Sequence, residues 1–425
     1  MTDLTPFDPT ERPSRRAALG FIAAGLAAGA LTVPLLMRKP ETAATKPGDA
    51  SRPADPQPDQ PPAPPLKDWP SLDALGERMV KLRFTPGLSL SVMHDGVMLY
   101  SRGFGSGDLQ TGARVTPRTG FRIASVTKQF TAAAILKLQE QGKLSVHDNL
   151  ARFMPEFPQA DQVTLAQMMS HTSGMNDYLN HQAQSVLVAA QTRDYTSPEL
   201  LRIISAVHPV YSIRPGQRWL YSNSAFSLLG IVVERVSGQN LADFYQTHLF
   251  APAGLRQTAM DERCSAFDGC DGYRPNYRIA AGFDPILPVS PTFAGGAGGI
   301  RSNTEDLTRW HDALFGGKVL KAASFAQMIT PMLLKDGSPA WEYVGPEKLN
   351  YGFGQGIGHL DGRAFIAHGG RLNGYTSHLR SLVHERLTVA VLYNSDGTGV
   401  PGFTAAQRAV RIEAMKLGMK EIGIA

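Results

Sequence analysis

The sequence predicts an α/β fold of the α+β type, in which an antiparallel sheet is built from N-terminal and C-terminal segments, is flanked by helices, and carries an inserted, mainly helical lobe. Strand-like patterns lie at both ends of the folded body, in "LSLSVMHDGVMLYSRGFG" and in "RAFIAHGG" with "YTSHLRSLVHERLTVAVLYNSD". Helical patterns dominate between them, from about residue 121 to 317. Pockets usually form where lobes meet, so we expect the functional site in the cleft between them.

The body is predicted to open with a helix and a hairpin. Ser71 can cap a helix that runs to about Arg83. Two strands then follow, joined by a turn at Asp95-Gly96. The next helix begins within "FRIASVTK" and is predicted to end at Gly142, because glycine readily adopts the left-handed conformation found after helix ends.

Later elements follow the same reasoning. Ser302 and Glu305 have the spacing of a capping box and predict a helix start. Two strands are predicted to turn at Glu385-Arg386, and a last helix to span about 403–417. The sheet therefore receives strands from both ends of the body.

Length and composition are those of a folded protein with appendages. The chain has 425 residues, of which 43% are hydrophobic and 19% charged. Its net charge of +5 is spread without a basic run in the body, so nucleic-acid binding is not expected. Cys264 and Cys270 could close a small disulfide loop or stay as free thiols. No residues have metal-ligand spacing, so we expect neither a metal nor another cofactor.

The first 37 residues are predicted to be an export signal or a membrane anchor. Arg15 and Arg16 precede an uncharged run from Ala17 to Met37, which resembles a twin-arginine signal. At about 1.5 Å per residue, this run is also long enough to cross a bilayer if it is not cleaved. Residues 38–70 are rich in proline and are expected to form a disordered linker. We therefore expect a periplasmic body at 71–425, either released or held at the inner membrane.

A serine and a lysine stand three residues apart at the start of the helix that follows Phe121. Residues at this spacing share a helix face, so Lys128 could bring its amine to the Ser125 hydroxyl, which needs a base to become a nucleophile. The Ser125 N–H would also be unpaired at the helix start and could form half of an oxyanion hole. In the structural alternative, Ser125 caps the helix and Lys128 extends to solvent. The motif alone does not decide, because Ser-x-x-Lys arises by chance about once in a chain of this length.

Downstream phrases favour catalysis. Tyr221 and Asn223 stand in "PGQRWLYSNSAFSLLG", and His368-Gly369-Gly370 ends a strand in "FIAHGGRLNGYTSHL". Together with "FRIASVTK", "MMSHTSGMNDY" and "AGGAGGIRSNTEDL", these phrases resemble the serine β-lactamase and penicillin-binding-protein superfamily, in its class C-like branch. The likeness spans about 88–396. It implies a β-lactamase/transpeptidase-like fold and a β-lactamase-related serine hydrolase.

The resemblance implies a role for the three residues that would carry the chemistry. Ser125 would attack a carbonyl and form an acyl-enzyme, while Lys128 and Tyr221 pass its proton to the leaving group. A phenol titrates near 10, so a Tyr221 base at pH 7 requires a shift of about three units, or about 4 kcal/mol. A charged Lys128 would supply this effect. A desolvated, neutral Lys128 acting as the base is the alternative, and the sequence leaves both open.

The resemblance also implies residues that hold the substrate, which would be a small molecule or a peptide. Asn223 would bind its amide oxygen, and the N–H of Arg371, after His368 and Gly370, would be the second oxyanion donor. Antibiotic-hydrolysing members have Lys-Thr-Gly at this third motif, and a neutral imidazole offers less to a substrate carboxylate, although Arg371 could lend charge. We therefore expect hydrolysis of ester or amide bonds, including D-amino-acid peptides, in the cell envelope. A β-lactamase, a D-Ala-D-Ala carboxypeptidase and a slowly acylating penicillin-binding sensor are the alternatives, and the oligomeric state is open.

Two further phrases are expected to be structural. "HTSG", residues 171–174, has the short polar side chains and the glycine of a tight turn. "AGGAGG", residues 294–299, predicts a close approach between two backbone segments.

Overall fold

The computed structural model describes residues 65–180, 184–191, 193–260, 269–279, 282–287, 289–344 and 347–425. The predicted signal or anchor, residues 38–64 of the predicted linker and Cys264 lie outside the described residues. Cys270 is a buried free thiol. None of the helices in the described ranges is long and apolar enough to cross a membrane.

An eight-stranded antiparallel sheet has the strand order β2-β1-β13-β12-β11-β10-β9-β8. The predicted hairpin at Asp95-Gly96 forms β1 (Gly87–His94) and β2 (Val97–Gly105). β1 pairs with the last strand of the chain, β13 (Leu387–Tyr393), so the prediction of a sheet assembled from both ends of the body is confirmed. The other strands of this sheet are β8 (Trp341–Val344), β9 (Glu347–Tyr351), β10 (Gly356–Leu360), β11 (Arg363–Leu372) and β12 (Tyr375–Leu382).

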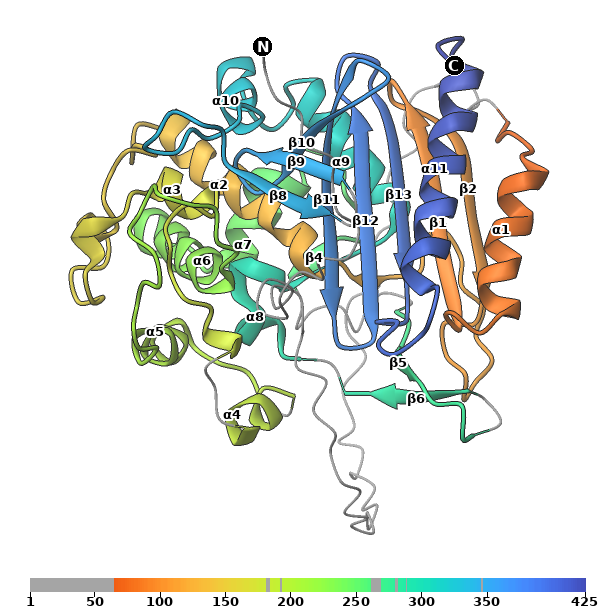
Figure 1. The fold of residues 1–425 in the computed structure, drawn as a ribbon, viewed down its shortest axis with the longest axis horizontal. Helices are drawn as coiled ribbons and strands as arrows, with labels where there is room; N and C mark the ends of the chain where they lie inside the picture. Colours follow the sequence, from red (N-terminus) through yellow and green to blue (C-terminus); the bar gives the residue numbers. More distant parts are fainter. Residues whose placement is uncertain are drawn as a thin grey trace, which may run out of the picture. The chain divides into compact units, whose positions relative to one another are not determined.

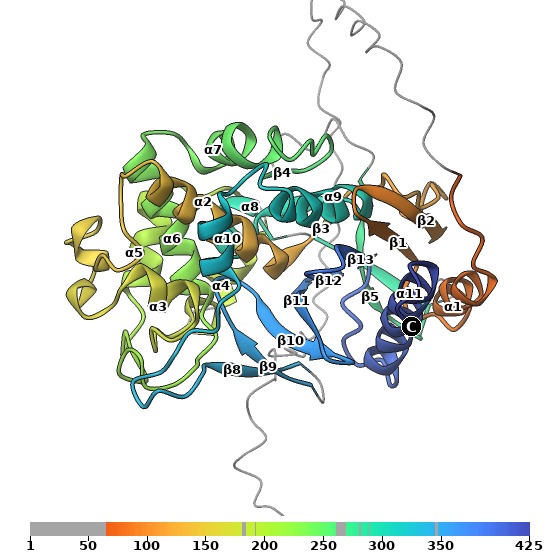
Figure 2. The ribbon, with the colours of Figure 1, turned by 90° about the horizontal axis from the view of Figure 1, so that it is seen from above.

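The two faces of the sheet are covered differently. α1 (Pro70–Lys81) and α11 (Phe403–Glu421) pack together over β1, β2 and β13, as Figure 1 shows. We call this side the outer face. α9 (Thr304–Phe315) packs against β1, β12 and β13 from the opposite side, the inner face, which is turned toward the helical lobe (Figure 2).

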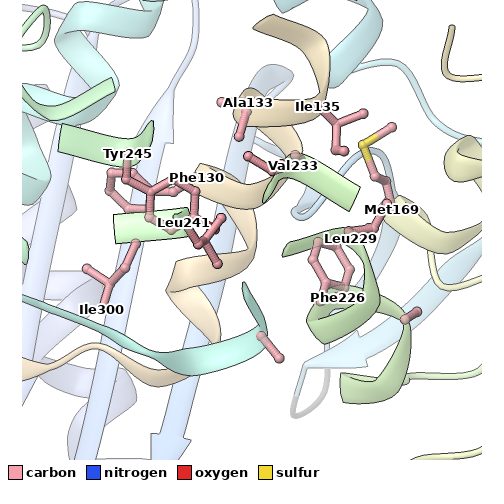
Figure 3. Packing of buried hydrophobic residues seen from close by; sticks show 14 of the residues in the cluster. Phe130, Ala133, Ile135, Met169, Phe226, Leu229, Val233, Leu241, Tyr245 and Ile300 are labelled. Carbon is pink, nitrogen blue, oxygen red and sulfur yellow. The ribbon is translucent and has the colours of Figure 1, made fainter. Parts of the chain in front are cut away.

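The helical lobe is built around two helices. α2 (Thr127–Glu140) is buried over most of its surface, as expected of a central helix, and Gly142 follows it with a φ of 71°. α6 (Asn223–Ser237) packs against it and contributes Phe226, Leu229 and Val233 to the buried cluster around it, as Figure 3 shows. The other helices are α3 (Leu165–Met169), α4 (Gln184–Ala189), α5 (Ser197–Ser205), α7 (Leu241–Tyr245), α8 (Pro291–Gly298) and α10 (Ala322–Met328), with 3₁₀ turns η1 (Ala124–Val126), η2 (Leu150–Arg152), η3 (Ala160–Gln162) and η4 (Tyr178–Asn180) and a π turn η5 (Gln246–Phe250).

Short strands connect the lobe to the sheet. β3 (Phe121–Arg122) and β4 (Ala259–Met260) both pair with β7 (Ile300–Ser302). β5 (Gly272–Pro275) pairs with β6 (Phe283–Ile286). β3 leads directly into η1 and α2, so it fixes the entry point of the central helix.

Two predicted helix starts were wrong. α1 begins one residue before Ser71, whose hydroxyl donates to Glu413 of α11. Ser302 ends β7, where its hydroxyl bonds Thr258, and Asn303 caps α9 in its place. Proline suits the first position of a helix, so α1 begins at Pro70 without a side-chain cap. Before α9, Ser302 and Asn303 are both good capping residues, and the bond of Ser302 to Thr258 leaves Asn303 to cap the helix. The last helix also runs four residues past its predicted end.

Candidate active site

Ser125 lies in η1, where the chain changes from strand β3 to helix α2. The preceding Ala124 has a φ of 48°, a left-handed conformation that alanine adopts only where its surroundings impose it. Ser125 is half-buried, and its side chain makes no capping bond to η1 or α2. The strained turn instead presents the hydroxyl to residues from other parts of the chain.

Lys128 is fully buried, so it does not extend to solvent. Its Nζ lies 3.1 Å from Ser125 Oγ, 2.8 Å from Asn223 Oδ1 and 2.9 Å from the carbonyl oxygen of Ala297. Burial lowers the pKa of Lys128 to about 7, although the carboxylate of Asp177 acts in the opposite direction. The "AGGAGG" phrase therefore contributes a backbone acceptor to the site, which the sequence did not indicate.

Tyr221 reaches the same hydroxyl from the segment before α6. Its OH donates to Ser125 Oγ over 2.6 Å, and Lys128 Nζ lies 4.7 Å from the centre of its ring. Ser222 caps α6 by accepting from the Ala225 N–H over 3.2 Å, which holds the preceding tyrosine in place. Burial raises the pKa of the Tyr221 phenol above its usual value, and so keeps its proton on at neutral pH.

Asn223 is the first residue of α6 and is held from two sides. Its Oδ1 faces Lys128, while its Nδ2 and N–H donate to Asp177 Oδ2 over 2.7 and 3.1 Å. Sequence reasoning missed Asp177. It stands in the quoted phrase "MMSHTSGMNDY", which was expected to be structural at its "HTSG" turn.

The "HTSG" segment does form a turn, with left-handed φ angles of 57° at His171 and 68° at Gly174. Its histidine also belongs to the site wall, because the imidazole centroid lies 4.3 Å from that of the Tyr221 ring. His171 Nδ1 accepts from the Ser222 N–H over 3.2 Å. Burial, and then the charge of Lys128, hold the pKa of His171 well below its usual value, so the imidazole is neutral. This packing role was also missed.

His368 of β11 is buried, and its neutral tautomer is defined by its neighbours. Nδ1 lies 2.5 Å from the carbonyl oxygen of Gly369, which can only accept, so Nδ1 carries the proton. Nε2 then accepts from the Tyr351 hydroxyl over 2.9 Å. Burial lowers the pKa of His368 to about 3, which keeps the imidazole neutral at physiological pH.

The strand beyond His368 runs beside Ser125. A Cβ atom on Gly370 would lie 2.3 Å from the Ile123 carbonyl oxygen and 3.0 Å from the Ser125 nitrogen, so only glycine allows this approach. The Arg371 guanidinium, expected as a charge for the substrate, is already hydrogen bonded to the Asp396 carbonyl. β10 pairs with β11 only as far as residue 367, so in the described part of the chain no strand occupies the same edge beyond it. This open edge can receive an extended substrate as an added strand.

The described ranges contain no group of three or more histidine, cysteine or carboxylate side chains placed to hold a metal ion. The Ser125 hydroxyl lies between the Lys128 amine and the Tyr221 phenol, at a turn whose backbone nitrogen lies close to Gly370 of the neighbouring strand.

The sheet with its inserted helical lobe is the fold of penicillin-binding-protein-like and D-amino acid amidase structures. The family can be stated more closely: the Beta-lactamase family model matches residues 72–414, and the chain belongs to this family. This confirms the resemblance found in the sequence motifs.

Individual relatives agree with the family assignment. Penicillin-binding protein 4* of Bacillus subtilis (strain 168) is 28% identical over 317 residues, which cover 71% of this chain and 66% of the relative. A D-aminopeptidase of Gluconobacter oxydans (strain 621H) is 28% identical over 313 residues, which cover 73% of this chain and 56% of the relative. The matched region thus spans less than two thirds of the length of these curated relatives.

Solved structures show the same fold. The octameric penicillin-binding protein homologue from Pyrococcus abyssi has a TM-score of 0.67 and 25% identity, over 81% of this chain and 77% of that chain. D-amino acid amidase from Ochrobactrum anthropi SV3 has a TM-score of 0.69 and 22% identity, over 82% of this chain and 98% of that chain.

Proposed function

We propose that this protein is a serine hydrolase that forms an acyl-enzyme on Ser125 and cleaves amide or ester bonds in small or D-amino-acid-containing substrates. The observation that carries the proposal is the position of Ser125 Oγ, 3.1 Å from Lys128 Nζ and 2.6 Å from the Tyr221 hydroxyl. Relatives named as D-aminopeptidase and D-amino acid amidase support the choice of substrate class.

Neutral Lys128 is the base in this proposal. Its Nζ has three polar neighbours, of which the Asn223 amide oxygen and the Ala297 carbonyl can only accept. A neutral amine has two N–H groups for these two acceptors, and its lone pair then faces the Ser125 hydroxyl. The lowered pKa of Lys128, caused by burial, and the raised pKa of Tyr221 both favour this arrangement over a tyrosinate beside an ammonium.

The reaction then proceeds in two halves. Lys128 takes the Ser125 proton as Oγ attacks the substrate carbonyl carbon, and the N–H groups of Ser125 and Arg371 stabilise the resulting oxyanion. The proton passes through the Tyr221 hydroxyl to the leaving amine or alkoxide as its bond to the carbonyl carbon breaks. Water attacks the acyl-enzyme by the same steps in reverse and releases the acid.

The third motif, His368-Gly369-Gly370, favours substrates that have no carboxylate where a bound β-lactam would place its own. His368 is neutral: its Nδ1–H donates to the Gly369 carbonyl oxygen, and its Nε2 accepts from the Tyr351 hydroxyl. It therefore supplies no positive charge at the open edge of β11. Neutral amides and esters fit this site better than anionic antibiotics do.

The cellular location is part of the same proposal. The pair Arg15-Arg16 before an uncharged run supports export through the twin-arginine pathway. The substrate would then be met in the periplasm or at the inner membrane.

A fluorophosphonate probe tests the proposal directly. The wild type is expected to be labelled at Ser125 and to hydrolyse a D-amino acid p-nitroanilide or a short-chain p-nitrophenyl ester faster than nitrocefin. Ser125→Ala should lose labelling and at least about a thousandfold in turnover, because the remaining groups have no nucleophile to activate. Ser338→Ala, at an exposed serine of the loop before β8, is the matched control and should retain both. Unchanged turnover in Ser125→Ala would rule out the mechanism.

A further inference from the structure

Asp177 follows the turn at residues 171–174 and is fixed by three hydrogen bonds. Its Oδ2 accepts from Asn223 Nδ2 over 2.7 Å and from the Asn223 N–H over 3.1 Å, and its Oδ1 accepts from the Leu179 N–H over 3.0 Å. In the described ranges, no lysine or arginine forms an ion pair with it within 4.0 Å. The carboxylate lies at the start of α6, where the backbone N–H dipoles favour a negative charge.

These bonds define the orientation of the Asn223 amide. A carboxylate can only accept, so the NH₂ of Asn223 must face Asp177 and its oxygen must face Lys128. A flipped amide would place two oxygens against each other and an NH₂ against the lysine N–H groups. One Nδ2 hydrogen remains free of Asp177 and available to a substrate amide oxygen.

We infer that Asp177 is a positioning residue that sets the pH at which Lys128 becomes a base, by holding the Asn223 oxygen on Lys128 Nζ and by placing a negative charge one side chain away. This inference rests on the function proposed above. Both effects stabilise the ammonium form of Lys128. Asp177 therefore limits how far burial can weaken the proton affinity of Lys128, and so keeps the base strong enough to deprotonate Ser125.

The other ionisable groups around Lys128 do not compete for this role. His171, from the turn after α3, and His368, from β11, are both held neutral by burial. Burial raises the pKa of the Tyr221 phenol, so it also stays uncharged. Glu342 of β8 acts on Tyr221, and burial raises its own pKa to about 8, but its carboxyl has no resolved effect on Lys128. Asp177 is the carboxylate that acts on Lys128.

The test is the pH dependence of fluorophosphonate labelling, which depends on nucleophile activation and not on the natural substrate. The wild-type labelling rate should rise with pH as Lys128 loses its proton. The midpoint of this rise, which we call the acid limb, should lie near the lysine pKa of about 7. Asp177→Asn keeps the side-chain size but removes the charge, so the ammonium loses stabilisation and the acid limb moves down by about one pH unit. The ratio of the labelling rates at pH 6 and pH 9 should then rise about fivefold.

Two variants make the result specific. Asp177→Glu keeps the charge and should return the acid limb toward the wild-type position, even if its plateau rate is lower. Glu342→Gln removes another carboxyl near the site and should leave the acid limb unchanged. A merely structural role for Asp177 would lower the plateau rate without moving the limb.

The outcomes separate this inference from the function that it rests on. An acid limb in Asp177→Asn equal to that of the wild type would overturn the role of Asp177 while leaving the hydrolase intact. A wild type that the probe does not label would refute the hydrolase itself. If Asp177→Asn shows no cooperative thermal transition, Asp177→Ser and Asp177→Glu provide the same contrast, since one removes the charge and the other keeps it.

Discussion

The two faces of the eight-stranded sheet are built from different kinds of side chain. Over β1 and β13 the outer face is apolar: Leu88, Leu90 and Val92 of β1 and Val389 and Val391 of β13 form one buried cluster with side chains of α1 and α11. Burying such side chains contributes about 1.5 to 3 kcal/mol each. This cluster stabilises the fold, and Ser125, Lys128 and Tyr221 are not among its members.

The inner face carries hydroxyl groups at the alternate positions. Ser89 and Ser91 of β1 both bond Thr304 of α9 over 2.8 Å. Ser377 of β12 donates over 2.7 Å to the carbonyl of Ile123, two residues before Ser125. Because successive side chains of a strand point to opposite faces, the same strands separate stability from positioning. The following predictions test this separation, from the largest expected effect to the smallest.

Lys128→Met should remove the base and reduce labelling and turnover at least about a thousandfold. It should also change how stability depends on pH. The pKa of Lys128 is lowered from 10.5 to about 7 by burial, so between these values the unfolded chain binds a proton that the folded chain does not. Wild-type stability should therefore rise with pH in this window, by about 1.4 kcal/mol per unit relative to Lys128→Met.

Urea unfolding at pH 7.5 and 9.5 measures this difference. Lys143→Met, at an exposed lysine just after α2, is the control. Its free energy of unfolding should change with pH as that of the wild type does. If the free energy of unfolding changed equally with pH in all three proteins, the buried Lys128 amine would not have the lowered pKa on which the proposed mechanism depends.

Leu90→Ala tests the outer face. The side chain is 1% exposed, so truncation should lower the free energy of unfolding by about 3 kcal/mol through lost burial and a residual cavity. kcat/KM should stay within about twofold, because the site lies on the opposite face of the sheet. Ser89→Ala, one residue earlier on the inner face, should cost only about 1 kcal/mol by losing its bond to Thr304. Guanidinium unfolding with parallel kinetics measures both, and a large kcat/KM loss in folded Leu90→Ala would contradict the separation.

Much of the sheet could be predicted from sequence because its strands are strongly patterned. β1, β2, β12 and β13 are rich in Val, Leu and Tyr and are bounded by clear turns, such as Asp95-Gly96. The strands β8 to β10 were not predicted. They are four or five residues long and mix glycine, asparagine and charged residues without a period of two, so only pairing in the folded chain defines them.

The candidate site also contains residues that the sequence predicted and residues that it did not. Ser125, Lys128 and Tyr221 lie in phrases that resemble a known family, so their proximity could be anticipated. Asp177 also lies in such a phrase, but nothing there shows that it contacts Asn223, 46 residues later. The local sequence of Tyr351 likewise gives no sign of its contact with His368, 17 residues later. Such supporting contacts depend on how loops pack, and short motifs contain no signal for that.

Gly370→Ala and Gly369→Ala test the comparison within one strand. A Cβ on Gly370, on the inner face, would lie 2.3 Å from both the Ile123 carbonyl oxygen and Ser377 Oγ, so β11 must move away from the nucleophile. We expect labelling and kcat/KM to fall about thirtyfold, with a stability loss of about 1 to 2 kcal/mol from overpacking. A Cβ on Gly369, on the outer face, would meet nothing closer than His378 Nδ1 at 3.4 Å, which is an ordinary contact. Gly369→Ala should therefore remain within about twofold of wild type, because added volume alone does not disturb the site. If the two variants lost activity equally, the stiffness of β11 would control the site, and the face to which the added Cβ points would not matter. The inner face would then have no special role.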